Sequence, residues 1–224
     1  MPHHPGLSGR APALSDCSIS GLIGRQEHSP CAVSSRRATI TTVRGYTFAI
    51  LGVGWLLWVL PFFLVNKQKQ PAKQVDKRAR WGIILVGVGY AILWQGHFWQ
   101  MQIGPWRMAL GITFFVFAAL LSWTGARALG RQWRVDAGLT ADHQLVTAGP
   151  YRVVRHPIYA SMLCTLCATG FLLAPWWLFV PSILFFIAGT EIRVHIEEKL
   201  LAAHFGEQFL EFKRRVPAYI PYLR

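Results

Sequence analysis

Charged side chains are scarce in this 224-residue sequence. They make up 15% of the residues, whereas soluble domains average roughly a quarter, and residues 46–65 carry none at all. Acidic residues are the scarcer kind, with 10 Asp and Glu against 23 Lys and Arg and a formal net charge of +13. This composition excludes an ordinary soluble domain. With 53% hydrophobic residues, 10 Trp and 14 Phe, the sequence predicts an integral membrane protein.

Cysteines and repeats are also few, and both absences exclude classes of function. Cys17 and Cys31 lie in a polar tail, while Cys164 and Cys167 form a Cys-x-x-Cys inside an apolar run that has no second pair. A buried helical pair is therefore favoured over zinc, which needs four ligands. The missing internal repeat argues against an inverted-repeat transporter. No basic surface interleaved with aromatic residues is evident, so we expect no nucleic-acid partner.

Five apolar runs follow a polar N-terminal tail. Residues 1–40 have no helical hydrophobic period and are predicted to be disordered, whether as a transit-like peptide or as an over-long start. The runs cover residues 46–65, about 81–99, 108–123, 158–174 and 176–190, and Pro175 turns the last two into a hairpin. We predict an all-α membrane protein of about five transmembrane helices, organised as the tail 1–40, three helices in 41–124 and a core in 125–224.

The basic residues predict the orientation of the chain in the membrane. Segment 66–80 has six Lys or Arg, the turn near Pro105 has one, segment 125–157 has five and the turn at Pro175 has none. The positive-inside rule then places the N-terminus outside and the C-terminus in the cytoplasm. The basic residues of the tail run against this assignment; they are Arg36, Arg37 and Arg44.

The stretch "YRVVRHPIY", residues 151–159, gathers cations at the mouth of the fourth run. Pro157 suits the first turn of a helix and favours an extended conformation for His156 before it. The free N–H groups of that helix, beside Arg155 and His156, would hold a carboxylate or phosphate well. The alternative is a lipid-interface anchor, but the turn "AGPY" just before the cluster favours a site.

A second polar stretch, residues 191–212, follows directly on the fifth run. Glu191, His195 and Glu198 share one helical face, while Arg193 and Glu197 stand four residues apart on another. A solvated helix with paired charges is the default interpretation. Because these residues begin at the membrane interface, where unpaired charge is expensive, the carboxylates could instead bind sugar hydroxyls or offset a cation. The isolated His97 of the second run is expected to be a packing residue rather than a haem ligand.

The order of these motifs resembles one family of membrane enzymes. "HQLVTAGPYRVVRHPIY", an apolar hairpin and "RVHIEEKLLAAHFGEQFLEFKRRVPAYIP" resemble the isoprenylcysteine carboxyl methyltransferase and phospholipid methyltransferase family over residues 143–221. The family pattern has Gly-Pro-Tyr, Arg-His-Pro-x-Tyr, Glu-Glu, Phe-Gly and a final Val-Pro-x-x-Ile-Pro. The sequence departs from it at Ser161, where Gly is usual, and at Phe209 and Phe212, where Tyr is common.

The resemblance implies S-adenosylmethionine as the methyl donor, in a cytoplasm-facing pocket between the 125–157 segment and the C-terminal helix. The residues implied for the adenosine side are His143, Leu145, Val146 and Gly149. Those implied for the methionine part are Tyr151, His156, Pro157 and Tyr159, with Arg155 beside them. Glu197 or Glu198 would meet hydroxyl or amino groups of the cofactor, and Arg193 would face the acceptor.

The chemistry of methyl transfer agrees with such a set. Its barrier falls chiefly when the nucleophile is aligned at about 3 Å and water is removed. A carboxylate acceptor then needs only a cation such as Arg193, whereas a thiol or amine must first lose a proton to His156 or a Glu. We favour O-methylation of an isoprenylcysteine-type carboxylate that enters from the bilayer among membrane lipids. The alternatives are an NADPH-dependent, sterol-reductase-like enzyme and a non-enzymatic membrane or haem-binding protein.

Overall fold

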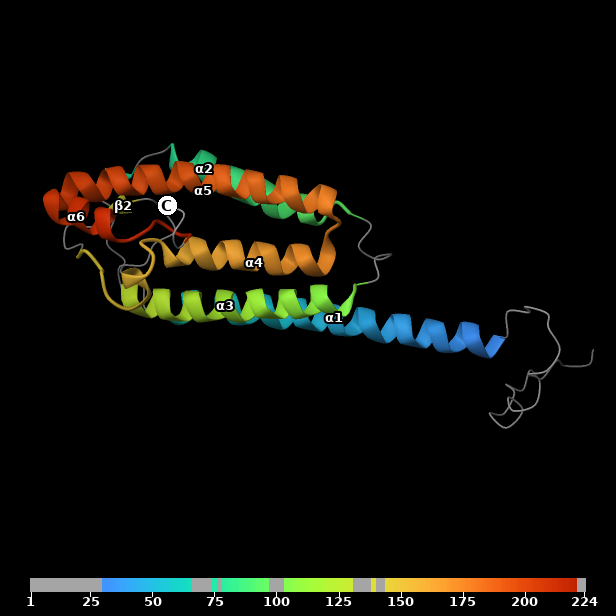
Figure 1. The fold of residues 1–224 in the computed structure, drawn as a ribbon. Coiled ribbons are helices and arrows are strands. Elements are labelled where there is room, and N and C mark those ends of the chain that lie inside the picture. Colours follow the sequence, from blue (N-terminus) through green and yellow to red (C-terminus); the bar gives the residue numbers. More distant parts are fainter. Residues whose placement is uncertain are drawn as a thin grey trace, which may run out of the picture. The chain divides into compact units, whose positions relative to one another are not determined.

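The computed structural model is almost entirely helical (Figure 1) and describes residues 30–65, 74–75, 78–96, 103–130, 138–139 and 144–220. Its elements are α1 (Pro30–Leu64), β1 (Gln74–Val75), α2 (Ala79–Leu93), α3 (Pro105–Leu129), β2 (Gly138–Leu139), η3 (Gly149–Arg152), α4 (Pro157–Leu173), α5 (Trp176–Phe205) and α6 (Glu207–Arg215). The two short strands pair antiparallel. Met1–Gly45 and Tyr46–Arg224 are two compact units, and the second holds all the polar clusters described below. The predicted all-α fold is confirmed.

Five apolar helices correspond to the five apolar runs of the sequence. Three helical stretches are long and apolar enough to cross a membrane, namely Gly45–Leu64, Pro105–Leu129 and Trp176–Phe205, and two shorter apolar helices are Ala79–Leu93 and Pro157–Leu173. The 17 residues of α4 extend about 26 Å, slightly less than the ~30 Å hydrocarbon layer. The prediction of a membrane protein is therefore confirmed.

Several boundaries differ from the sequence expectation. Helix α1 begins at Pro30, within the tail expected to be disordered, and proline suits the first turn of a helix; residues 1–29 lie outside the described part. Helix α5 continues without a break from the apolar run through the charged stretch to Phe205, because Pro181 lies near its start, Gly189 keeps helical geometry against α2, and the charged residues do not interrupt a helix. Gly206 has a φ of 56°, a left-handed conformation that glycine adopts easily, and it separates α5 from α6.

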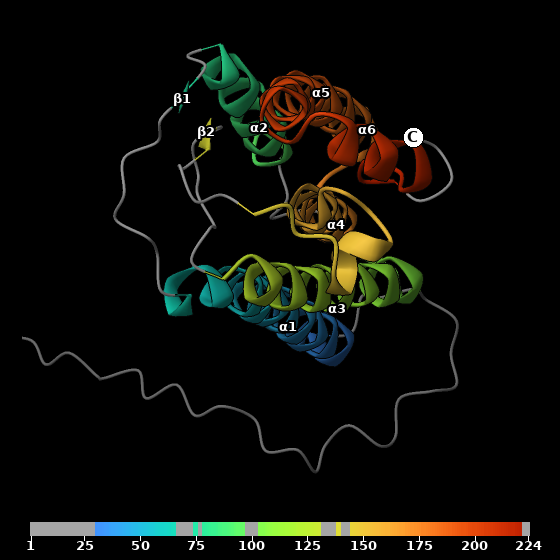
Figure 2. The same ribbon diagram turned by 90° about the vertical axis from the view of Figure 1, so that its left-hand side faces the viewer.

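Helix α4 lies between two helical layers (Figures 1 and 2). Helices α2 and α5 run side by side on one side of it, and α3 with the second half of α1 covers the other. One apolar cluster joins α2, α4 and α5 around Leu93, Leu166 and Phe186, and a second joins α1, α3 and α4 around Phe115 and Leu172. The central position of α4 is consistent with a sequence that is apolar all round.

Small residues bring α2 and α5 into backbone contact. A β-carbon placed on Gly89 would lie 2.8 Å from the carbonyl oxygen of Ser182, and one on Gly189 would lie 2.6 Å from that of Gly82. The hydroxyl of Ser182 donates to the carbonyl of Gly89 at 2.7 Å. Close approach through small residues is the usual way for helices to associate in lipid. The first half of α5 is thereby fixed against α2, and the polar half of α5 continues from it.

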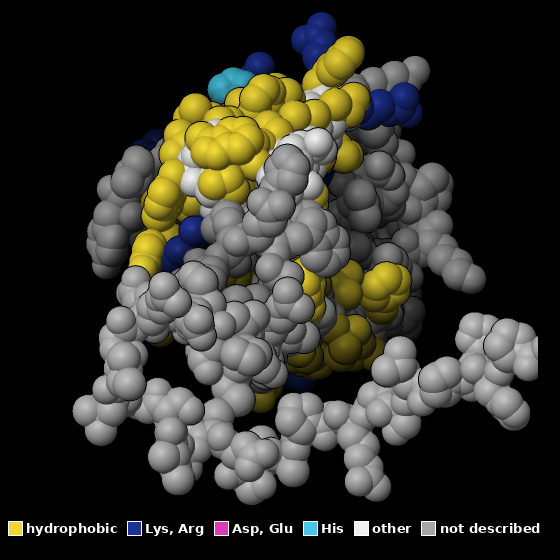
Figure 3. Space-filling view, turned by 90° about the vertical axis from the view of Figure 1, so that its right-hand side faces the viewer, with side chains coloured by type: hydrophobic (Ala, Val, Ile, Leu, Met, Phe, Trp, Pro, Cys, Tyr) yellow, Lys and Arg dark blue, Asp and Glu magenta, His cyan; other side chains and the backbone are white. Residues whose placement is uncertain are grey.

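The end of the bundle at the α4–α5 turn is fastened by Arg107, in the first turn of α3. Its Nε donates to the carbonyl of Phe171 at 2.9 Å, and its Nη2 donates to those of Gly170 and Ala174. These carbonyls lie at the C-terminal end of α4; that of Gly170 also accepts from the backbone N–H of Ala174, whereas that of Phe171 lacks a helical donor because residue 175 is proline. Hydrophobic side chains cover much of the described surface at this end (Figure 3), including the exposed rings of Trp106, Trp176 and Trp177.

Candidate functional site

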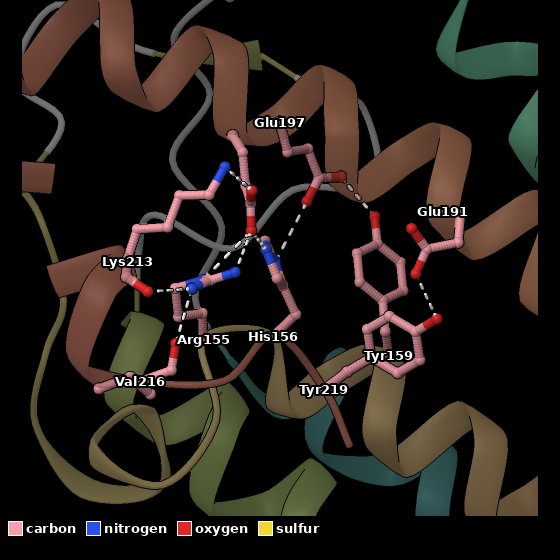
Figure 4. A network of polar contacts seen from close by, with 9 residues as sticks. Arg155, His156, Tyr159, Glu191, Glu197, Lys213, Val216 and Tyr219 are labelled. Carbon is pink, nitrogen blue, oxygen red and sulfur yellow. Dashed lines mark hydrogen bonds and ion pairs between the residues drawn. The ribbon is translucent and has the colours of Figure 1, made fainter. Parts of the chain in front are cut away.

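Buried polar side chains gather at the other end of the bundle, where α4 begins and the charged half of α5 lies. Arg155, His156, Arg193 and Glu198 are all less than 10% exposed. Arg155 and His156 meet Glu197, Tyr159 and the segment that follows α6 (Figure 4). Glu198 joins this network through Arg155, and Arg193 joins it through Tyr159 and Glu197. The two polar stretches singled out in the sequence, 143–159 and 191–212, are thus neighbours in space.

The local sequence before α4 folds as predicted. Gly149 has a φ of 61° and starts the 3₁₀ turn η3, which is the turn expected from "AGPY". His156 occupies the N-cap of α4 with φ −126° and ψ 66°, and Pro157 is the first helical residue. Because proline needs no hydrogen-bond acceptor there, the helix can begin immediately after the cationic pair. A β-carbon on Gly125 of α3 would be in ordinary contact with Pro157, so this helix start packs against α3.

Tyr159 connects Arg193 and Glu197. The Nε of Arg193 donates to the tyrosine hydroxyl at 2.7 Å, and that hydroxyl donates in turn to Oε1 of Glu197. Nη2 of Arg193 also donates to the same carboxylate oxygen at 3.1 Å. Arg193 is only 6% exposed. Its guanidinium is held in place by hydrogen bonds to Tyr159 on α4 and to Glu197 on α5. The Glu197 side chain is 23% exposed, which leaves part of its carboxylate accessible.

The imidazole of His156 lies between the two carboxylates of the Glu-Glu pair. Its Nδ1 is 3.7 Å from Oε2 of Glu197, and its Nε2 is 3.5 Å from Oε1 of Glu198. Neither distance is a good hydrogen bond, and the buried Nε2 has no hydrogen-bond partner among the described residues. A buried polar atom left unbonded typically costs about 1–3 kcal/mol. This nitrogen is therefore suited to receive a group from outside the chain.

Arg155 differs from Arg193 because it bonds to backbone carbonyls as well as to a carboxylate. Its Nε and Nη2 donate to Oε1 of Glu198 at 3.1 and 2.6 Å, while Nη1 donates to the carbonyls of Lys213 and Val216 at 2.7 and 2.6 Å. Lys213 Nζ lies 2.8 Å from the other oxygen of Glu198. The backbone N–H groups of Arg155 and His156 donate to the carbonyls of Pro217 and Ala218. Arg155 and Glu198 thus tie the chain after α6 to the start of α4.

The remaining predicted residues lie around this network or outside the described part. Leu145 and Val146 are half-buried in the extended segment that leads to Gly149, and His143 lies outside the described residues, as does His97. Tyr151 is buried, and burial together with the Glu197 carboxylate raises its pKa, which keeps the phenol protonated. Arg152, by contrast, is exposed.

Two contacts of the site were missed by the sequence reasoning. The hydroxyl of Tyr219 donates to Oε1 of Glu191 at 2.6 Å, and its ring packs with Tyr159 and Val194 in a buried cluster. Burial raises the pKa of Tyr219. The second contact is the ion pair of Lys213 with Glu198, which joins α6 to α5. The final "VPAYIP" motif was a signal for the first contact, because a Pro-flanked aromatic residue in a polar tail is unusual unless it packs on something.

Fold and site together define a class: a helical membrane protein whose one end buries a charged network between the start of α4, the charged half of α5 and the chain after α6. A sequence model of the family "Phospholipid methyltransferase" matches residues 106–208, which include most of this network. The resemblance of the chain to the isoprenylcysteine carboxyl methyltransferase and phospholipid methyltransferase family is thereby confirmed.

The chain is also similar to individual proteins, most of them isoprenylcysteine O-methyltransferases by name. The protein-S-isoprenylcysteine O-methyltransferase of Schizosaccharomyces pombe is 29% identical over 236 residues, covering 87% of this chain and 97% of the relative. The enzyme of the same name from Xenopus laevis is 29% identical over 132 residues, 53% of this chain and 42% of the relative. The cobalt-zinc-cadmium resistance protein CzcN of Cupriavidus metallidurans is 27% identical over 144 residues, 64% and 62% of the two chains. The matched region thus spans about half the length of several curated relatives.

Proposed function

We propose that the protein transfers the methyl group of S-adenosylmethionine to a lipophilic acceptor in the membrane, with a carboxylate of the isoprenylcysteine type as the favoured acceptor. The observation that carries this proposal is the buried Arg193, held by Tyr159 and Glu197 next to His156 at the end of the bundle. The confirmed family resemblance and the names of the relatives support the reaction class.

The residues of the network fit a charged donor of this kind. The part-exposed carboxylate of Glu197 is suited to hydroxyl or amino groups, and the unbonded Nε2 of His156 is suited to a polar group that would complete its hydrogen bonding. The donor supplies a methyl group on a positively charged sulfur. The half-buried Leu145 and Val146, with the turn at Gly149, would line the adenosine side as the family resemblance implies.

Arg193 is the cation that would hold the acceptor carboxylate. The acceptor oxygen forms a bond to the methyl carbon while the carbon–sulfur bond breaks, so a neutral ester results and no proton is transferred. A base is therefore unnecessary for a carboxylate, and the work of the protein is alignment and exclusion of water. Tyr159 and Glu197 would fix the direction of the guanidinium, which Arg193 could not keep alone because its stem has several rotatable bonds.

Arg155 and Glu198 receive a different role in this proposal from the one expected of them. Both side chains are satisfied by each other, by Lys213 and by backbone carbonyls, so little hydrogen-bonding capacity is left for a cofactor. We assign them to holding the chain after α6 against the start of α4. Of the Glu-Glu pair, only Glu197 would then contact the donor.

The orientation of the site in the membrane follows from the basic loops. The segments that join α1 to α2 and α3 to α4, residues 66–80 and 125–157, hold most of the interhelical Lys and Arg. They lead in the sequence to the start of α2, where Gly82 lies beside Arg193, and to the start of α4, and both of these helix starts belong to the polar end. We propose that this end faces the cytoplasm. A lipophilic acceptor would reach it sideways from the bilayer, in which its apolar part stays.

The decisive experiment is methyl transfer by the purified full chain in detergent. The protein is incubated with radiolabelled S-adenosylmethionine and, separately, with N-acetyl-farnesylcysteine, a phosphatidylethanolamine and an alkyl thiol. Label in a base-labile ester of the prenylcysteine supports the proposal. Label only in the amine or the thiol would retain the reaction class and replace the acceptor. Absence of donor binding by calorimetry, together with binding of NADPH, would overturn the proposal.

A further inference from the structure

The geometry points to Gly82, in the first turn of α2, as a positioning residue for Arg193. A β-carbon on Gly82 would lie 2.5 Å from Cγ of Arg193 and 3.3 Å from its Cδ. The shorter separation is far below ordinary van der Waals contact, so the arginine stem occupies the space that a side chain at this position would fill. The inference rests on the proposed function, in which Arg193 faces the acceptor.

The path of the stem decides where the guanidinium goes. From its origin on α5, the Arg193 side chain passes over the backbone of α2 at Gly82, and its Nε and Nη2 then reach Tyr159 and Glu197. A long side chain that is free to rotate loses conformational entropy when it is fixed in one rotamer. The surface of α2 removes part of that freedom beforehand, and it also covers the stem, so that Arg193 is only 6% exposed.

Helix packing accounts for one of the two close approaches at this glycine, and the Arg193 stem accounts for the other. A β-carbon on Gly82 would also lie 2.6 Å from the carbonyl oxygen of Gly189, but Gly89 provides a comparable approach farther along the same two helices. The nearest atoms to a β-carbon on Gly89 would be the carbonyl oxygen of Ser182, the backbone nitrogen of Phe186 and the Cβ of Phe186. Gly82 therefore combines packing with contact to a side chain of the site, whereas Gly89 is restricted to packing.

The same helix supplies a neutral comparison. A β-carbon on Gly87 would meet nothing within 4 Å. Gly82, Gly87 and Gly89 thus separate the three possible effects of a methyl group on α2: displacement of Arg193, change of helix propensity, and separation of the two helices. Alanine at an exposed helix position is expected to stabilise the helix slightly and so to leave the melting temperature equal or a little higher.

The consequence for function is that α2 shapes the acceptor side of the site. Helix α2 lies before residues 106–208, the part that matches the family model, and it contributes no polar group to the network in Figure 4. What α2 contributes is space for the Arg193 stem, because Gly82 has no side chain. Substitution there should disturb the acceptor more than the donor, because Glu197 and His156 do not contact α2 through Gly82.

The test compares Gly82→Ala, Gly87→Ala and Gly89→Ala in the full-length protein in detergent, with N-acetyl-farnesylcysteine as acceptor. Gly82→Ala and Gly89→Ala should both lower the melting temperature, and Gly87→Ala should not. Only Gly82→Ala should reduce kcat/KM for the acceptor strongly, by about tenfold or more, since a 1 Å misplacement can cost about a hundredfold. The dissociation constant of S-adenosylmethionine should stay unchanged in all three. An equal loss of turnover in Gly82→Ala and Gly89→Ala would overturn the inference.

A second measurement keeps the inference testable if no acceptor is turned over, which would be a failure of the proposed function instead. Arg193→Ala removes Cγ and Cδ, so it should restore part of the melting temperature lost in Gly82→Ala when the two changes are combined. The combination with Gly89→Ala should show simple additivity. If Gly82→Ala and Arg193→Ala are additive as well, Gly82 does not position Arg193.

Discussion

Oε1 of Glu198 accepts hydrogen bonds from both Nε and Nη2 of Arg155, and both side chains are almost completely buried. Through Nη1 of the same arginine, the pair also holds the carbonyls of Lys213 and Val216. The pair therefore fastens three parts of the chain, namely the start of α4, the charged half of α5 and the end of α6. Arg155 of "RHP" and Glu198 of "EE" are therefore partners of each other. Under the proposed function neither of the two contacts the donor or the acceptor.

Glu198→Gln is expected to destabilise the fold strongly. Removing one charge of a buried pair leaves the other uncompensated, at a cost of about 3–5 kcal/mol. The matched control is Glu207→Gln, because the Arg214–Glu207 pair has side chains that are 65% and 73% exposed and is worth at most about 1 kcal/mol. Thermal unfolding in detergent measures both. Equal melting temperatures for the two variants would contradict the role given to Arg155 and Glu198.

Glu197→Gln is expected to act on the donor instead. Its carboxylate is part-exposed, so its pair with Arg193 is better solvated than the Arg155–Glu198 pair, which the change leaves intact, and the melting temperature should fall less than in Glu198→Gln. Hydrogen bonds to a charged group contribute about 1.5–3 kcal/mol, which corresponds to a tenfold to hundredfold weaker binding of S-adenosylmethionine. Isothermal titration calorimetry checks this, with the exposed Glu211→Gln as the control. Unchanged affinity would remove Glu197 from the donor site.

Tyr159→Phe tests the bond that directs Arg193. The variant loses the hydroxyl between Arg193 and Glu197, and we expect kcat for the acceptor to fall by about tenfold to a hundredfold as the guanidinium loses its direction. Tyr219→Phe is a matched control because it also loses one tyrosine–glutamate bond, that to Glu191, while the bonds among Arg193, Tyr159 and Glu197 stay intact. Steady-state kinetics decide between them. A similar loss of kcat in both variants would mean that general packing, and not the direction of Arg193, limits the reaction.

Local features of the site could be predicted from the sequence, whereas contacts between distant segments could not. The start of α4 at Pro157 follows from proline geometry, and the Arg193–Glu197 pair follows from helical spacing. The partner of Arg155 lies 43 residues away on another helix. No periodicity within either segment encodes that pairing, and so the sequence alone assigns Arg155 to a ligand rather than to Glu198.

The position at which α5 ends could not be predicted from the sequence either. Charge at residue 191 indicates the end of an apolar run, but charged residues do not break helices, and the backbone continues to Gly206. Because α5 continues beyond residue 191, Arg193 and Glu197 lie beside the first turn of α4, where both bond to Tyr159. The contribution of Gly82 was invisible for a related reason, since a glycine in an apolar helix gives no sign of which neighbour needs the space.

Arg107→Met should destabilise the bundle without affecting the polar end. The arginine donates to three carbonyls at the C-terminal end of α4; that of Gly170 keeps a bond from the N–H of Ala174, but those of Phe171 and Ala174 would lose this partner, and a carbonyl left unbonded in an apolar environment costs about 1–3 kcal/mol. Arg127→Met is the control, because Arg127 is exposed and its described contact is to the face of Trp123. We expect a melting temperature well below that of the control, with an unchanged dissociation constant for S-adenosylmethionine at a temperature where the variant is folded. Weaker donor binding at full stability would show instead that the two ends of α4 are coupled, and that the site depends on how the far end of this helix is held.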